Sequence, residues 1–284
     1  MVALLLAAIL ALHAAPGSGP VHFALLGDRT GEAQPGVYEQ VLREAAAGHP
    51  AFLLQAGDVI QGLNDAAAEG EWQEFQRILA PYRHYALYLA PGNHDIWSRQ
   101  SEELFRKHAG RAPHYSFDYG PAHFTILDNS RSDELTAGEL LFLEKDLEAH
   151  AAQPVKFIVS HRPSWLFNVV LRNSGFPLHR LAKKYGVRYV IAGHVHQMLR
   201  ADLDGVMYVS LPSAGGHLRA SKRYEDGWFF AYTLVNVSGK GVDFQVHELN
   251  APHGQGRVTA MEDWGVAGLV RKLSLGRGPQ RLNP

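Results

Sequence analysis

Short apolar runs alternate with segments of helical spacing along most of this chain. An apolar run of about 4–8 residues bounded by turn residues is typical of a buried strand, and apolar residues at i, i+3 and i+4 are typical of an amphipathic helix. This pattern predicts strands at residues 21–26, 51–56, 86–90, 155–160 and 187–192. It predicts helices between them, with apolar faces in residues 37–45, 72–79, 102–108, 140–147 and 178–185.

The remaining strands indicate a mixed architecture. Residues 115–119 and 123–128, separated by Gly120 and Pro121, predict a β-hairpin. Further strands are predicted at residues 206–210, 228–237 and 242–247. Strands and helices that alternate early, followed by more strands, predict a layered α/β fold.

We expect one domain over residues 21–250, because neither a repeat nor a long linker divides this part of the chain. Residues 251–284 are rich in Gly and Pro, with a short apolar patch at residues 264–270. We expect them to form a loosely packed C-terminal tail. Residues 1–20 form an apolar segment that ends in a spacer of small residues.

The apolar run at residues 2–12 suits an export signal. It is too short to span a bilayer, and small residues follow it where a signal would be cleaved. No Lys or Arg precedes it, so only the amino terminus supplies positive charge. We expect a periplasmic or secreted protein, with an uncleaved N-terminal anchor or an apolar helix as the alternative. No later run is long enough to predict a membrane span.

Composition narrows the possible chemistry. The 284 residues are 46% hydrophobic and 19% charged, which suits a globular domain with a sizeable core. The net charge of -1 argues against a general nucleic-acid-binding surface. The chain has no cysteine, which excludes disulfides and thiolate metal sites. Any metal must therefore use nitrogen and oxygen ligands.

Polar groups able to bind a metal follow five of the predicted strands. They are Asp28, Asp58, Asn93, His161 and His194, with His196 two residues further. Since the carboxyl ends of strands in an open α/β sheet converge on one crevice, these side chains are expected to meet. The set of carboxylates, amide and imidazoles suits Mn, Fe or Zn and suffices for two ions.

The order of these motifs resembles the calcineurin-like metallophosphoesterase superfamily. The resemblance covers residues 21–212 and rests on Gly27-Asp28, Gly57-Asp58, Gly92-Asn93-His94-Asp95, His161 and Gly193-His194-Val195-His196. It implies a four-layer α/β/β/α sandwich of two mixed sheets flanked by helices. It also implies a centre of two divalent or mixed-valence transition-metal ions. In that centre Asp58 bridges both ions, Asp28 and His196 hold the first, and Asn93, His161 and His194 hold the second.

Four residues are candidates for catalysis or substrate binding. By the resemblance, His94 contacts the phosphoryl group and either protonates the leaving oxygen or stabilises the charged transition state. Asp95 either orients the His94 imidazole or caps a turn. Arg29 either clamps a phosphate or forms a structural ion pair. His217, in a Gly-containing basic segment, either contacts an anionic substrate or lies in a solvated loop.

Two departures from the family pattern affect the metal centre. The family commonly has Asp-x-His in its first motif, where this chain has Asp28-Arg29-Thr30. We therefore expect a weaker first site, completed by Thr30 or water. Residues 58–61 lack the tyrosine of the purple-acid-phosphatase branch, so an Fe(III) charge-transfer site is not expected.

The sequence thus predicts a hydrolase of phosphate esters in which a hydroxide that bridges two metal ions attacks the phosphorus. A phosphomonoesterase acting on a small molecule or a phosphoprotein is the first choice, and a phosphodiesterase or nucleotidase is the alternative. A non-catalytic metal-binding relative is the rival from another class, favoured only by Thr30. An exported structural module without metal is a third possibility. The oligomeric state is not predicted.

Overall fold

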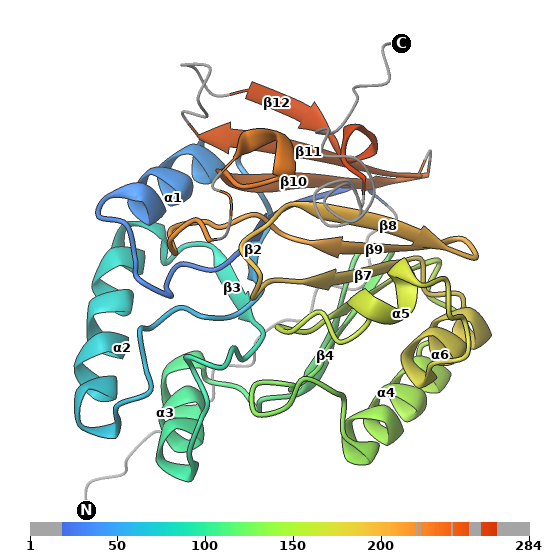
Figure 1. Ribbon diagram of the computed structural model, residues 1–284, viewed down its shortest axis with the longest axis horizontal. Helices are drawn as coiled ribbons and strands as arrows, with labels where there is room; N and C mark the ends of the chain where they lie inside the picture. Colours follow the sequence, from blue (N-terminus) through green and yellow to red (C-terminus); the bar gives the residue numbers. More distant parts are fainter. Residues whose placement is uncertain (1–18, 220, 222, 240, 250–256, 266–284) are drawn as a thin grey trace, which may run out of the picture.

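Two six-stranded mixed sheets pack face to face in the part of the chain that this computed structural model describes, residues 19–219, 221, 223–239, 241–249 and 257–265 (Figure 1). The first sheet has the strand order β12-β11-β10-β1-β2-β3. Its strands are β1 (Val21–Leu26), β2 (Phe52–Gln55), β3 (Ala86–Leu89), β10 (Phe230–Ser238), β11 (Gly241–Leu249) and β12 (Arg257–Ala260). The second sheet has the order β4-β5-β6-β7-β9-β8. Its strands are β4 (Tyr115–Tyr119), β5 (Ala122–Ile126), β6 (Val155–Val159), β7 (Tyr189–Ala192), β8 (Leu199–Leu203) and β9 (Val206–Ser210).

Helices cover the outer face of each sheet. Three cover the first sheet: α1 (Val37–Ala47), α2 (Asp65–Leu79) and α3 (Arg99–Ala109). Three cover the second: α4 (Ala137–Ala149), α5 (Leu166–Val170) and α6 (Pro177–Tyr185). The two groups lie on opposite sides of the molecule in Figure 1. The predicted four-layer α/β/β/α sandwich is therefore confirmed. The pattern did not predict α5 and β8, which have five residues each and are too short for a clear periodicity.

Strand direction places the polar motifs at one end of both sheets. In the first sheet β1, β2 and β3 are mutually parallel. In the second sheet β5, β6, β7 and β9 are parallel. The turns that follow β1, β2, β3, β6 and β7 carry the predicted metal ligands, so parallel pairing brings these turns to a common edge.

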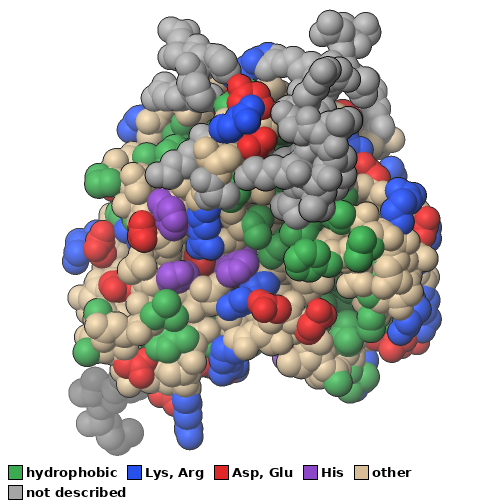
Figure 2. All heavy atoms as spheres, in the orientation of Figure 1, with side chains coloured by type: hydrophobic (Ala, Val, Ile, Leu, Met, Phe, Trp, Pro, Cys, Tyr) green, Lys and Arg blue, Asp and Glu red, His purple; other side chains and the backbone are tan. Residues whose placement is uncertain are grey.

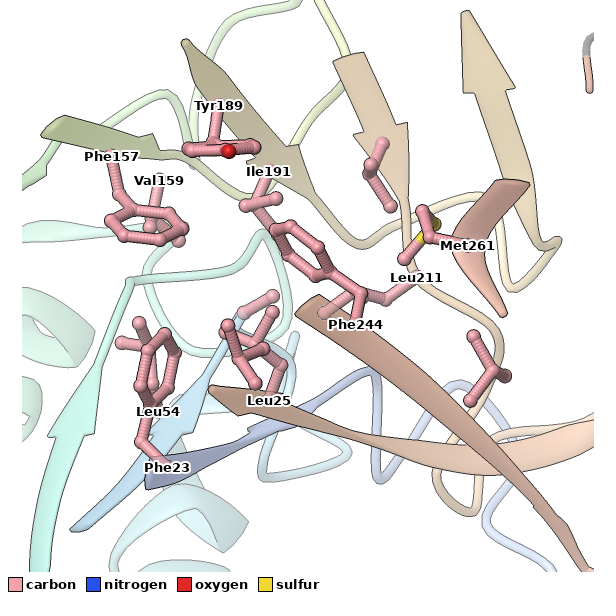
Figure 3. Close-up of a cluster of buried hydrophobic side chains, with 14 of the residues drawn as sticks. Phe23, Leu25, Leu54, Phe157, Val159, Tyr189, Ile191, Leu211, Phe244 and Met261 are labelled. Carbon is pink, nitrogen blue, oxygen red and sulfur yellow. The ribbon is translucent and has the colours of Figure 1, made fainter. Parts of the chain in front are cut away.

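A core of alternating side chains joins the two sheets. Phe23 of β1 and Phe157 of β6 face each other edge to face, with ring centroids 5.7 Å apart. Their neighbours Ala24 and Ile158 face the helical layers instead. Figure 3 shows side chains from both sheets converging in this layer. Each large apolar side chain buried here stabilises the fold by about 1.5–3 kcal/mol, so the core holds the two sets of turns in register.

Residues 257–265 belong to the fold, which corrects the expected loosely packed tail. Strand β12 pairs with β11 in antiparallel register. Met261 and Trp264 are buried, and the Trp264 indole Nε1 donates to Thr259 Oγ1 at 2.8 Å. These apolar residues are too few and too irregular to produce a periodic pattern. The remainder of the tail and the expected export signal at residues 1–18 lie outside the described residues. None of the described helices is long and apolar enough to cross a membrane.

A buried histidine connects β4, β5 and α4. His123 has no exposed side-chain surface, and its ring nitrogens lie 2.7 Å from Asp118 Oδ1 and 2.9 Å from Asp146 Oδ2. Burial by itself lowers the pKa of His123, but hydrogen bonding to Asp146 and Asp118 outweighs it and raises the pKa above the ordinary value. The raised pKa favours the charged form of this imidazole, which pairs with the Asp146 carboxylate that α4 places beside the hairpin.

We expect Trp264→Ala to lower the free energy of unfolding by about 3–5 kcal/mol, because it empties a packed site and removes the Thr259 contact. Val258→Ala is the control, since Val258 lies on the same segment and is 54% exposed. The control should change the stability by less than about 0.5 kcal/mol. Urea denaturation measures both. Equal effects of the two substitutions would mean that the segment contributes no packing.

The His123 network should make stability depend on pH. A raised folded-state pKa contributes stability that is fully present below the unfolded pKa and is lost as pH rises through the folded pKa. The stability difference between the wild type and His123→Gln should therefore be largest at acidic pH and should shrink as the pH rises above the ordinary histidine pKa of about 6.5. Urea unfolding at several pH values tests this. A difference that stays constant would show that folding does not change the pKa of His123, and one that grows with pH would show that the fold lowers it.

Candidate metal centre

Side chains from the carboxyl ends of five strands, drawn from both sheets, meet in one cluster. These are Asp28 after β1, Asp58 after β2, Asn93 after β3, His161 after β6, and His194 and His196 after β7. Asp28, Asp58, His161 and His196 have no exposed surface. Figure 2 shows histidines gathered around a hollow near the middle of one face. The structure therefore brings together all six side chains that the sequence predicts as ligands.

The cluster contains two adjoining groups of donor atoms. In the larger group, His161 Nε2 lies 3.1 Å from Asp58 Oδ2 and 3.2 Å from both Asn93 Oδ1 and His194 Nδ1. In the smaller group, His196 Nε2 lies 3.1 Å from Asp28 Oδ2. The groups meet where Asp28 Oδ2 and His161 Nε2 are 4.0 Å apart. This division matches the two sets of ligands that the family resemblance implies.

Backbone carbonyls set the tautomers of two imidazoles. His161 Nδ1 donates to Ala56 O at 2.8 Å, and His196 Nδ1 donates to His217 O at 2.7 Å. Because a carbonyl only accepts, each Nε2 is left to face the cluster with its lone pair. A metal ion needs a neutral imidazole held in this way.

Unpaired buried atoms show that the cluster fits a cation. Asp58 Oδ2 and His196 Nε2 are both buried, and beyond their 3.1 Å approaches to His161 Nε2 and Asp28 Oδ2 neither has a hydrogen-bond partner among the described residues. A buried acceptor without a partner costs about 1–3 kcal/mol, and more when it is charged. A divalent ion held by nitrogen and oxygen donors would satisfy both atoms.

Protonation in the metal-free cluster follows from its charges. Burial disfavours the charged form of His161, but the Asp58 and Asp28 carboxylates outweigh it and raise the pKa of His161 to about 9. Burial and the charge on His161 lower the pKa of His194 to about 4. The raised pKa of His161 favours a proton on that ring in the metal-free cluster, and a metal ion that binds His161 Nε2 would displace it.

The backbone is strained at three of the ligand candidates. Asp58, His194 and His196 have φ values of 54°, 69° and 57°, in the left-handed region. Such a conformation costs roughly 1–3 kcal/mol for a residue with a side chain, and persists only where the surroundings enforce it. Part of that support is direct, since the backbone N–H of His194 donates to Asp28 Oδ1 at 2.9 Å.

Two motif glycines permit the close approach of neighbouring turns. A Cβ atom on Gly92 would lie 2.0 Å from Asp58 Oδ1, and one on Gly193 would lie 2.4 Å from Asp28 Oδ1. No side chain fits at these distances. Gly92 and Gly193 are therefore required because the Asp58 and Asp28 carboxylates occupy the space that a side chain would need.

His94 is held by backbone contacts. Its N–H donates to Asp58 Oδ1 at 2.8 Å, and its ring Nδ1 donates to the carbonyl of Gln61. Nε2 has no hydrogen bond to the described residues, so it is the ring atom left to act on a substrate. The sequence did not single out Gln61, because a carbonyl that acts through the backbone leaves no side-chain signal.

Asp95 makes contacts that fit the second of its two expected roles, the capping of a turn, and its catalytic role stays a prediction. Its fully buried carboxylate accepts the N–H groups of Asp58, Val59 and Gly92 at 2.7–2.8 Å. No contact joins it to the His94 imidazole among these interactions. Burial, with the nearby charge of Asp58, raises the pKa of Asp95 to about 6. Asp95 therefore fastens the β2 turn to the β3 turn.

Arg29 also makes structural contacts. Its guanidinium is therefore engaged within the fold and is not placed for the first of its two expected roles, the phosphate clamp. Its Nη1 donates to Val59 O at 2.6 Å, and its Nη2 pairs with Glu74 of α2 at 3.2 Å. Only 8% of the residue is exposed. The alternative expectation, a structural ion pair, describes these contacts.

The residues near the first motif define the rim of the cluster. The Thr30 hydroxyl donates to Gln61 Oε1 at 2.8 Å, so its proton is directed away from the smaller donor group. The His217 ring lies 5.9 Å from that of His196, and its Nδ1 donates to the carbonyl of Gly31. His217 is therefore placed at the edge of the cluster, where its substrate-binding role stays a prediction.

Asn129 supports the cluster from behind. Its Oδ1 accepts the N–H groups of His161 and Arg162 at 3.1 and 3.0 Å, and its Nδ2 donates to Arg162 O at 2.8 Å. Asn129 follows β5, which is parallel to β6. Its place at the end of a strand was the available signal, although it contributes orientation and no ligand atom.

Two relatives of similar sequence are named as phosphodiesterases of cyclic nucleotides. The chain is 31% identical over 203 residues to the 3',5'-cyclic adenosine monophosphate phosphodiesterase CpdA of Escherichia coli (strain K12). This match covers 68% of this chain and 70% of that protein. It is 28% identical over 171 residues to the 3',5'-cyclic-nucleotide phosphodiesterase alr5338 of a Nostoc species, which covers 57% of this chain and 62% of that protein.

Solved structures share the fold at low identity. The purple acid phosphatase PPD1 from yellow lupin seeds superposes with a TM-score of 0.61 at 16% identity, over 86% of this chain and 53% of that chain. This chain thus spans about half the length of the lupin enzyme. GAP50, the anchor in the inner membrane complex of Plasmodium, superposes with a TM-score of 0.56 at 15% identity, over 94% of this chain and 98% of that chain.

The family model described as calcineurin-like phosphoesterase matches residues 19–198. That match spans most of the described chain and ends two residues beyond His196, so it includes all six ligand candidates. The chain belongs to the calcineurin-like phosphoesterase family.

Proposed function

We propose that this protein hydrolyses small phosphodiesters, with 3',5'-cyclic nucleotides as the first substrates to test. Family membership makes the chain a phosphoric ester hydrolase. The observation that carries the proposal is the cluster of six donor residues, of which Asp58, His161 and His194 alone could hold one metal ion, together with the unsatisfied buried atoms of Asp58 and His196. The diester is favoured because the 31% and 28% identical relatives are named as cyclic-nucleotide phosphodiesterases. The phosphomonoesterase that the sequence analysis puts first is not confirmed and becomes an outcome of the test.

The proposal assigns the two donor groups to two ions of Mn, Fe or Zn. Asp28 and His196 would hold the first, Asn93, His161 and His194 the second, and Asp58 both. When bound, such ions polarise the phosphoryl oxygens and lower the pKa of the water that attacks the phosphorus. With Thr30 in place of the family's histidine, we propose that the first ion has fewer protein ligands and exchanges more readily.

We propose that His94 acts as the general acid that protonates the leaving group. Opening a cyclic diester releases an alkoxide, which is a poor leaving group unless it is protonated. The Gln61 carbonyl holds His94 Nδ1–H, so Nε2 is available to donate to the leaving oxygen. General-acid catalysis of this kind typically contributes ~10²–10⁴ in rate. Asp58 Oδ1 positions the His94 backbone and so couples the imidazole to the metal ligands.

The first test separates the candidate activities. Protein freed of metal is reloaded with Mn, Fe or Zn and given 3',5'-cyclic AMP, bis-p-nitrophenyl phosphate and p-nitrophenyl phosphate. We expect kcat/KM for the cyclic diester to exceed that for the monoester by about tenfold or more. Asp58→Asn should lose both metal content and turnover. A preference for the monoester would show that the protein is a phosphomonoesterase. Full metal loading without hydrolysis of any ester would contradict an enzymatic function and would indicate a non-catalytic metal-binding protein.

Substitutions at two adjacent residues should separate catalysis from structure. His94→Gln should keep its metal content and stability and lose roughly 10²–10⁴ in kcat. Asp95→Asn should lose metal and unfold at lower urea concentration, because an amide cannot accept at both oxygen positions. His84→Gln, an exposed histidine, is the control and should match the wild type. Unchanged kcat in His94→Gln would remove the general-acid assignment.

A further inference from the structure

Arg219 lies beside the candidate metal centre without an anionic partner. A Cβ atom on Gly31 would lie 3.3 Å from Arg219 Nη2 and 3.0 Å from His196 Cε1, so the guanidinium and the imidazole border the same small space. Arg219 Nε is buried and has no hydrogen-bond partner within the described chain. No carboxylate of the described residues forms an ion pair with Arg219.

Backbone contacts fasten the segment that carries Arg219 to the first-motif turn. The N–H groups of Ala214 and Gly216 donate to Asp28 O at 3.0 and 3.1 Å, and His217 N–H donates to Gly31 O at 3.1 Å. A Cβ atom on Gly216 would lie 2.0 Å from Thr30 O. The two segments therefore touch backbone to backbone, and this contact holds Arg219 near the smaller donor group.

Nearby arginines differ from Arg219 in their pairing. Arg29 pairs with Glu74, Arg162 with Asp133 and Arg223 with Glu225. A guanidinium stays charged at any ordinary pH, and a buried polar atom without a partner is costly. Its planar fork of donors also matches the oxygens of a phosphate. An unpaired arginine beside a phosphoesterase cluster therefore has the chemistry of an anion-binding group. Figure 2 shows basic side chains beside the histidines of this hollow.

We propose that Arg219 binds the substrate phosphate by donating to a non-bridging phosphoryl oxygen, the role that Arg29 cannot fill. The inference rests on the proposed function, because it assigns the anion to that same site. Arg219 also supplies a permanent positive charge on the side where Thr30 replaces the family's histidine. The ligand class is a phosphate monoanion or dianion, and inorganic phosphate is its simplest member.

Phosphate binding to the metal-loaded protein tests the inference without requiring turnover. Isothermal titration with inorganic phosphate is run on the wild type, Arg219→Gln, Arg219→Lys and Arg223→Gln, with metal content measured for each. A lost charge-assisted hydrogen bond predicts about 10- to 100-fold weaker binding in Arg219→Gln at unchanged metal content. Arg219→Lys should recover part of the loss, because it keeps the charge and loses the fork. Arg223→Gln, on the same segment but paired with Glu225, should bind within about twofold of the wild type.

Steady-state kinetics add a second readout. If Arg219 holds the phosphate in both the ground state and the transition state, KM for the preferred ester should rise more than kcat falls. Unchanged phosphate affinity in Arg219→Gln, loss of metal in that variant, or an equal loss in Arg223→Gln would overturn the inference. Wild-type protein that binds phosphate through Arg219 and hydrolyses no ester would instead overturn the proposed function and leave this inference standing.

Discussion

The carboxylate of Asp95 joins the two turns that carry Asp58 and Asn93, two of the six ligand candidates. It accepts N–H groups from Asp58 and Val59 after β2 and from Gly92 after β3. Hydrogen bonds to a charged group contribute about 1.5–3 kcal/mol each, which is enough to hold Asp58 in its left-handed conformation. With Asp58 fixed, its Oδ1 accepts the His94 N–H and its Oδ2 faces His161. One buried acid therefore determines the position of the bridging candidate and of the catalytic candidate together.

The packing of the two sheets positions the other ligand candidates. Parallel strands from each sheet end at the same edge, and the aromatic layer between the sheets fixes the spacing of those ends. Hydrogen bonds then cross between the sheets at the cluster. His161 of the second sheet donates to Ala56 of the first, and His194 N–H donates to Asp28. The cluster lies where the two sheets meet, so its geometry depends on how the sheets pack against each other.

Electrostatics explain why a cation suits this junction. Two buried carboxylates face three imidazoles whose tautomers are partly set by backbone carbonyls, and two ligand atoms remain unpaired. Without a metal, a proton on His161 balances part of the charge, which is why burial fails to lower its pKa. Arg219 extends this positive potential toward the rim, where a phosphate would enter. In our proposal the cluster combines a site for cations with a site for the anion on which they would act.

The sequence by itself determined the layered fold, the six ligand candidates and the family, because each depends on residues close together in the chain. A glycine and a polar residue after an apolar run indicate the end of a strand, and this signal does not depend on which strand pairs with it. Only the tertiary structure decided the roles of Arg29, Asp95, Gln61 and Arg219, and the packing of residues 257–265. These depend on which carbonyl, N–H group or carboxylate from a distant segment comes within reach of a side chain. Arg29 and Arg219 are chemically identical, but Arg29 pairs with Glu74, whereas the buried Nε of Arg219 has no partner among the described residues.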